Sequence, residues 1–207
     1  MSITDALLLG ALHFCRNAIG IVTRPYETYR RIVEHSSFAE LVPLAGLLSL
    51  YFAIASAVKA PLFRPYFLTK QFILLASGVG LSFLLIVGTI WVIGQAVGGK
   101  GTVKGVLMAW AYTLVPTLCW FLVTSVLYLL LPPPRTERLQ GIVFSILYLL
   151  FSSVLFFWKL VLSYLTLRFG LRLDLKQIVA TSTIAAPIIG IYSYLMYIFG
   201  IFKVPFL

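Results

Sequence analysis

Residues 71–99 read QFILLASGVGLSFLLIVGTIWVIGQAVGG, a run of 29 residues without a charged side chain. A helix needs about 20 apolar residues to cross the hydrocarbon core of a bilayer. A helix also satisfies its own backbone hydrogen bonds, which the lipid around it cannot do. This stretch therefore predicts one membrane crossing and sets the fold class of the chain.

Four further stretches lack charge, at residues 41–58, 105–134, 139–158 and 177–202. With the first they predict an all-α integral membrane protein, a bundle of five transmembrane helices near residues 41–59, 72–97, 106–131, 142–167 and 178–201. The composition agrees, because 61% of the 207 residues are hydrophobic and only 11% are charged. A soluble domain has about 45–50% and about 25% of these residues.

The first 40 residues predict two amphipathic helices that lie along the headgroups, in a segment 1–38 ahead of a transmembrane domain at 39–207. On a helical wheel the first has an apolar face of Ile3, Leu7, Ala11, Phe14, Ala18 and Ile21, and a wet face of Asp5, His13, Arg16 and Asn17. After Pro25 a second apolar face holds Tyr26, Tyr29, Ile32 and Val33, with Glu27–Arg31 and Arg30–Glu34 spaced as ion pairs. The alternative is that both helices pack on the bundle as ordinary surface helices.

The positions of Lys and Arg predict the orientation of the bundle. With a cytoplasmic N-terminus, the inner segments hold nine of these residues and the outer segments hold six. We therefore expect the N-terminus in the cytoplasm and the C-terminus outside.

Small residues at a spacing of four predict close helix packing. They are Ala45, Ser49, Ala53 and Ala57 in the first crossing, and Ser182, Ala186 and Gly190 in the fifth. We expect these faces to pack inside the bundle, with homodimerisation as the alternative. Pro116 and Pro187 each fall inside a crossing and are expected to kink it.

Residues 94–101, GQAVGGKG, come close to a phosphate-binding P-loop. Gly101 stands where that motif needs Ser or Thr, and both flanks are apolar crossings in place of a strand and a soluble helix. We therefore expect a tight turn and no nucleotide.

The sequence offers little for catalysis. His13, His35, Cys15 and Cys119 stand apart from possible partners, and no pair of carboxylates falls within a crossing. We predict no enzyme activity, no catalytic residue, no cofactor and no metal. The absence of a basic soluble module argues against nucleic acid, whereas the net charge of +10 suits anionic lipid headgroups.

Lys159 is the one ionisable residue that we place inside a crossing, nine residues before Arg168. Its long stem is expected to snorkel to the cytoplasmic headgroups. The alternative is contact with an anionic group, a lipid phosphate or a partner carboxylate, inside the bundle. We take Lys159 and the basic turn with Arg168, Arg172 and Lys176 as candidate lipid or partner contacts.

In its order of motifs the chain resembles the Yip1 family of five-helix membrane proteins, in the compact bacterial form. The resemblance rests on RPYETYRRI at 24–32, GGKGTVKG at 98–105 and AYTLVPT at 111–117, with Trp158 and the turn at 168–176 in support. Eukaryotic members act in early secretory trafficking, associate with Rab-type GTPases, and usually carry a long cytoplasmic N-terminal region, which this sequence lacks. The resemblance implies a multi-pass protein of the bacterial inner membrane and carries over no catalytic residue.

Together these features predict a non-enzymatic scaffold or accessory subunit that organises membrane partners or lipids. Its expected partners are anionic lipids and other membrane proteins or a second copy of the chain. The alternative is a transporter or lipid-translocating protein with an anion contact in the bundle.

Overall fold

The fold is known from a computed structural model, which describes residues 3–59, 65–130 and 139–199. All the regular elements in these ranges are helices. In chain order they are α1 (Ile3–Thr23), α2 (Pro25–His35), the short 3-10 helix η1 (Phe38–Glu40), α3 (Leu41–Lys59), α4 (Pro65–Ala96), α5 (Val103–Tyr112), α6 (Leu114–Leu130), α7 (Leu139–Leu165), the π-helical turn η2 (Thr166–Gly170) and α8 (Leu175–Ile198).

Six helical segments in the described part of the chain are long and apolar enough to cross a membrane. Five of them correspond to the five expected crossings, and the sixth is α1, from Thr4 to Thr23. The expected bounds hold within about three residues except at the start of α4. This helix begins seven residues early, at Pro65, because a proline is well tolerated in the first turn.

The expected third crossing is two helices, because the helical run is interrupted at Thr113. Pro116 lies three residues further on, lacks an N–H, and its ring crowds the carbonyl of Tyr112. The interruption therefore falls one turn before the proline. α8 runs on through Pro187 without interruption.

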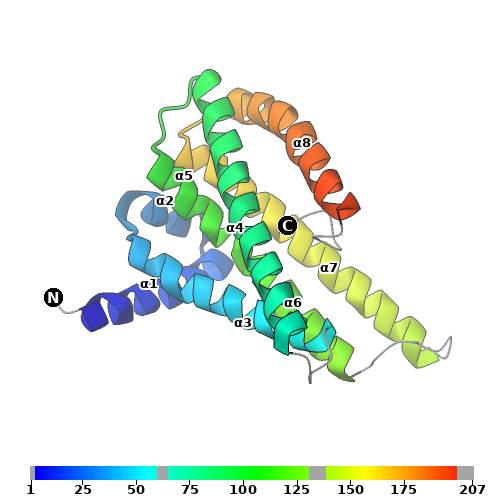
Figure 1. The fold of residues 1–207 in the computed structure, drawn as a ribbon. Helices are drawn as coiled ribbons and strands as arrows, with labels where there is room; N and C mark the ends of the chain where they lie inside the picture. The colour runs from blue at the N-terminus through cyan, green and yellow to red at the C-terminus, as the bar shows by residue number, and fades with distance from the viewer. Residues whose placement is uncertain (1–2, 60–64, 131–138, 200–207) are drawn as a thin grey trace.

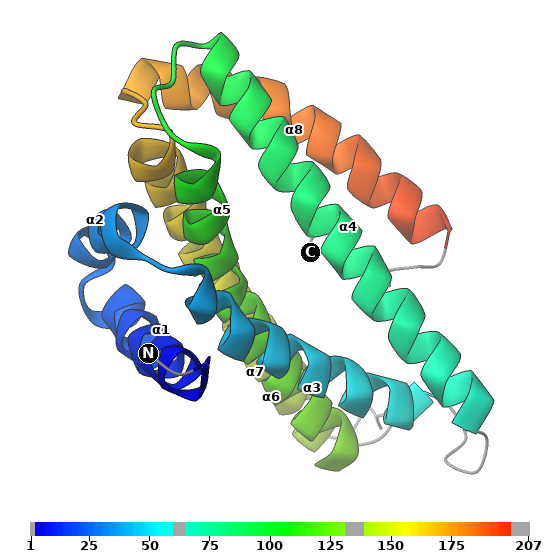
Figure 2. The same cartoon turned by 60° about the vertical axis from the view of Figure 1, so that its left-hand side comes forward.

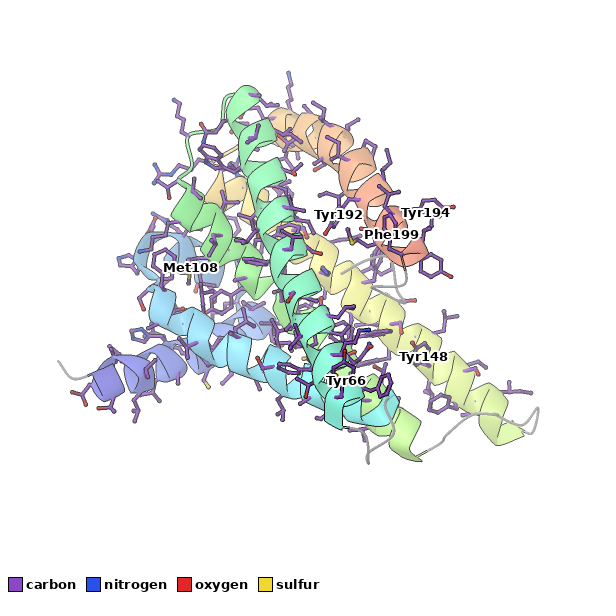
Figure 3. All side chains as sticks on the ribbon, viewed as in Figure 1. Tyr66, Met108, Tyr148, Tyr192, Tyr194 and Phe199 are labelled. Carbon is purple, nitrogen blue, oxygen red and sulfur yellow. The ribbon has the colours of Figure 1, made fainter. Side chains whose placement is uncertain are left out.

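The helices form two connected groups, which Figures 1 and 2 show from different sides. In one group α6 pairs with α7, α2, α3 and α5 contact this pair, and α1 packs against α2 and α3; in the other, α8 packs along α4. Tyr192 lies between α8 and α4 (Figure 3), where its hydroxyl is 2.8 Å from Ser82 Oγ. α3 and α5 join the two groups through their contacts with α4.

Two buried clusters hold the fold together. The larger lies between the N-terminal helices and the bundle and is centred on Phe14, Tyr29, Met108, Tyr112 and Leu162. The smaller joins α4, α5, η2 and α8 through residues that include Ile86, Val106, Leu171, Leu173 and Ile178. The outward faces are apolar as well, with Leu149 67% and Ile191 64% exposed. An apolar surface of this kind suits a lipid solvent.

The buried and exposed faces of α1 differ from those expected. Its buried stripe is Gly10, Phe14, Asn17 and Ile21, so Asn17 is inside and not on a wet face. Leu7, which we placed on the apolar face, is 42% exposed, and Leu8, Leu12 and Ile19 are 66%, 59% and 66% exposed. The position of Asn17 is decided by hydrogen-bond partners on other elements, which a helical wheel of α1 does not include.

In α2, Tyr29 and Ile32 are fully buried, whereas Tyr26 is exposed and meets the ring of Phe169 edge-on. Burial raises the pKa of the Tyr29 phenol, which keeps it neutral. The Arg30–Glu34 pair is present, but Glu27 pairs with Arg24 in place of Arg31.

Candidate functional site

The basic residues near the start of α8 gather with those that follow α4, because a glycine turn ends α4. Gly98 has a φ of +101°, which suits glycine, and the N–H groups of Gly98 and Gly99 donate to the carbonyls of Gln95 and Gly94. This hydrogen-bond pattern is the Schellman motif, which closes helix C-termini. The glycines at 94–101 therefore form a tight turn, as expected.

Backbone contacts lock this turn to the chain that leaves α7. The N–H of Lys100 donates to the carbonyl of Leu171 at 3.0 Å. A Cβ on Gly101 would lie only 1.8 Å from the carbonyl oxygen of Gly170, so only glycine fits there. Gln177 adds a side-chain hydrogen bond of 3.1 Å to the carbonyl of Val97. These contacts hold the two connections together as one unit.

Five cations lie on this unit, which we call the basic end: Lys100, Lys104, Arg168, Arg172 and Lys176. Figure 1 shows where its two connections meet, at the end of α4 and the start of α8. All five except Arg168 are exposed. Asp174 is the single acidic residue in the two connections, so the charge of this surface is strongly positive.

Two of the five cations have partners within the protein. Arg168 donates to the carbonyl of Leu173 at 2.8 Å and pairs with Asp174 at 3.1 Å. The ammonium of Lys104 lies 5.5 Å from the ring centre of Phe38. The first interaction holds Arg168 at the basic end, whereas the second directs Lys104 towards η1.

Arg172 has a φ of 57°, in the left-handed region. This conformation costs a non-glycine residue about 1–2 kcal/mol, so the surrounding contacts must impose it. The neighbouring Leu171 and Leu173 are fully buried. They anchor the turn from both sides and leave the arginine exposed between them.

Lys159 lies apart from the basic end, in α7. Its Nζ donates a hydrogen bond of 3.1 Å to Thr117 Oγ1 in α6. The side chain is half-buried and reaches between two helices of the bundle. We expected it to extend towards the headgroups, and this contact directs it to the bundle.

A buried polar network was not expected from the sequence. The Glu40 carboxylate accepts hydrogen bonds from the hydroxyl of Tyr112 and the amide of Asn17, and these three residues are at most 3% exposed. Asn17 in turn accepts from Arg31 Nη2 at 2.9 Å. The network joins α1 and α2 to the bundle. The available signal was Glu40 itself, an acidic residue directly before an apolar crossing.

The expected helix-packing faces point outwards. Ala45, Ser49 and Ala53 in α3 and Ser182, Ala186 and Gly190 in α8 are all exposed, while the side chain of Ala57 is outside the described part. They do not pack inside this bundle, because α3 buries Leu44, Phe52 and Ala55 and α8 buries Ile178, Thr181 and Ala185. Self-association through these faces stays a prediction.

The arrangement can hold anions, through exposed cations at the basic end and a half-buried ammonium at Lys159. No group of three His, Cys, Asp or Glu residues suited to a metal occurs in the ranges that the structure describes. The expected lack of catalytic and cofactor sites stays a prediction.

The family model for the Yip1 domain matches residues 19–198. Comparison with curated proteins and with solved structures gives no match. The family match covers all the described helices except the first part of α1. Because it spans well over half of the sequence, the chain belongs to the Yip1 family.

Proposed function

We propose that the protein is a non-enzymatic membrane scaffold or accessory subunit that organises anionic lipids and membrane partners at its basic end. The observation that carries the proposal is the union of two connections that presents Lys100, Arg172 and Lys176 together. Each Lys or Arg near an anionic membrane surface contributes about 1 kcal/mol of attraction. Because backbone contacts already bring the three positions together, binding an anion does not have to order the two connections first.

The proposal includes a topology. Five crossings, by α3, α4, the α5–α6 pair, α7 and α8, place the basic end in the cytoplasm of a bacterial cell, the N-terminus inside and the C-terminus outside. α1 and α2 lie on the cytoplasmic surface of the inner membrane. In support, α1 lies to the left of α4 in Figure 1 and is directed crosswise to it, and its Asp5 and Arg16 are exposed.

The experiment compares wild type with a triple variant, Lys100→Gln, Arg172→Gln and Lys176→Gln, each purified from native membranes after mild crosslinking. Retained phospholipids and proteins are identified by mass spectrometry. Wild type is expected to retain anionic phospholipid that the triple variant loses. Lys70→Gln is the control, because Lys70 is exposed near the other end of α4. Equal anionic lipid in wild type and triple variant would refute the proposal.

Lipid translocation is a second candidate function, and the interruption at Thr113 favours it. Transporters place substrate sites where a crossing is broken. The break lies one turn from Thr117, which holds Lys159. The test is a vesicle assay with fluorescent phosphatidylglycerol and an impermeant quencher. A scaffold leaves the rate of lipid exchange between leaflets at that of protein-free vesicles, whereas a translocating protein raises it.

A further inference from the structure

The ammonium of Lys159 points away from the basic end. α7 runs towards that end, and side chains on a helix lean towards the helix N-terminus. Lys159 is nine residues before Arg168, which is about 13 Å along the helix axis. Its stem would have to turn towards the C-terminal end of α7, against this lean, to bring the ammonium to the level of the basic end.

The register between α6 and α7 agrees with this direction. Trp120 donates to Ser152 Oγ at 2.9 Å, and in this antiparallel pair Leu155 is then level with Thr117. Lys159 is one turn, about 6 Å, closer to the basic end than Leu155. Its Nζ nevertheless reaches Thr117, so the ammonium lies about 20 Å from the level of Arg168. That depth is well inside a hydrocarbon core about 30 Å thick.

No carboxylate of the described residues pairs with this ammonium. The four ion pairs in this part of the chain lie elsewhere, at the basic end and in α2 with its flanks. The Glu40 carboxylate is occupied by Tyr112 and Asn17. Thr117 supplies a neutral oxygen, which accepts a hydrogen bond but leaves the charge of Lys159 uncompensated. An unpaired charge at such depth is costly.

The side chain can be reached from the lipid side. On the outward surface of α7, Phe156, Phe157 and Leu160 are 51%, 64% and 49% exposed. Lys159 is half-buried between this surface and α6. An anionic group that moves along this surface in the plane of the membrane approaches the exposed part of the Lys159 side chain.

We propose that Lys159, positioned by Thr117, forms an anion site within the membrane that holds the phosphate of an anionic phospholipid entering along α7. The ammonium has three N–H donors, and Thr117 uses one of them. The remaining donors suit phosphate oxygens, and a lipid phosphate drawn below the headgroup level would compensate the charge of the ammonium. The site is separate from the basic end and does not depend on the scaffold role.

Native mass spectrometry with added phosphatidylglycerol tests the site. All variants carry the neutralised basic end, Lys100→Gln, Arg172→Gln and Lys176→Gln, so that lipid held there does not contribute. In this background Lys159→Met is expected to weaken phosphatidylglycerol binding about tenfold or more, since hydrogen bonds to charged groups are strong. Lys159→Arg keeps the charge and is expected to keep the lipid. Lys70→Met is the control without effect.

The outcomes separate the two proposals. Loss of lipid on neutralising the basic end, with no further change in Lys159→Met, overturns the Lys159 site and leaves the basic end standing. A phosphatidylglycerol complex that is lost only in Lys159→Met, and not on neutralising the basic end, supports the Lys159 site and overturns lipid binding at the basic end. Inorganic phosphate added to the same samples is expected not to displace the lipid, and displacement at millimolar phosphate would contradict a lipid site.

A measurement on the unaltered side chain covers the case in which Lys159→Met does not fold. In phosphatidylglycerol bilayers with 15N-labelled lysine, the signal present in wild type and absent in Lys159→Arg belongs to Lys159. Solid-state NMR recoupling between 15N and 31P is expected to dephase this signal strongly, as for nuclei a few ångströms apart. A Lys159 signal that phosphorus does not dephase would overturn the proposal.

Discussion

Glu40 is a carboxylate kept inside an apolar protein by donors from three directions. Tyr112 and Asn17 donate to one oxygen, and the backbone N–H of Ser37 donates to the other at 3.2 Å. Buried carboxylates are tolerated when their hydrogen bonds are made in this way. Because Asn17, Glu40 and Tyr112 come from three different elements, their interaction fixes α1 against the start of α3 and the end of α5.

The first prediction concerns Glu40→Gln. The amide keeps the size of the side chain but removes the charge and brings an NH₂ group against existing donors. We expect a loss of about 1.5–3 kcal/mol in stability, the usual contribution of a hydrogen bond to a charged group. Thermal unfolding in detergent measures it. Glu34→Gln, at an exposed pair with Arg30, is expected to change stability by less than about 1 kcal/mol. Equal effects of the two changes would contradict a role for the network.

The residue scale is where sequence reasoning succeeded least. The polarity of Asn17 placed it on a wet face, because a helical wheel contains no information about residues 40 and 112. The charge of Lys159 lies, as predicted, within a helix long and apolar enough to cross a membrane, but its direction depends on α6, which supplies Thr117. In both cases the deciding partner is far away in the chain.

At the scale of elements, local sequence rules worked well where the deciding contacts are local. Pro25 begins α2, and the glycines after α4 form its C-terminal turn. Pro116 indicated a disturbance of its crossing, and the interruption at Thr113 lies one turn before it. The small-residue faces failed as internal packing surfaces, since periodicity alone does not say which side of a helix meets its neighbours.

The second prediction concerns the glycine at the contact between the two connections. Gly101→Ala would place its methyl group against the carbonyl of Gly170 and force the connections apart. We expect destabilisation of about 1–3 kcal/mol, as for other overpacked sites, together with weaker binding of anionic lipid. Thermal unfolding and native mass spectrometry measure the two effects.

Gly46→Ala is the matched control for Gly101→Ala. Gly46 lies in α3, and a Cβ added there meets nothing within 4 Å. The change is expected to stabilise the helix slightly, by about 0.5–1 kcal/mol, since glycine is a poor helix former. If Gly101→Ala were as harmless as Gly46→Ala, the close contact of the connections would be refuted.

The third prediction concerns α1, which is long enough to cross the membrane but is proposed to lie on its surface. Five crossings place the two termini on opposite sides of the membrane, and a sixth crossing by α1 would place them on the same side. We expect an N-terminal fluorescent-protein fusion to be active in the cytoplasm and a C-terminal alkaline-phosphatase fusion to be active outside. Termini on the same side would mean that α1 crosses.

At the scale of the whole molecule, the sequence predicted the class of fold, the family and the approximate bounds of the helices. These follow from hydrophobic length, which each segment carries by itself. The pairing of α4 with α8 and of α6 with α7 was not predicted, because apolar faces look alike in sequence. The basic end was predicted only in part. Its residues were visible in the sequence, but the contact of Lys100 with Leu171 that unites them was not.

The orientation of the basic end is the claim on which the scaffold proposal depends, and side-specific cysteine labelling tests it most directly. In a background of Cys15→Ser and Cys119→Ser, single cysteines replace the exposed residues Lys100, Lys176 and Lys70. We predict that an impermeant thiol reagent labels positions 100 and 176 only from the cytoplasm, and position 70 only from outside. Labelling of positions 100 and 176 from outside would contradict a basic end that faces the anionic cytoplasmic leaflet.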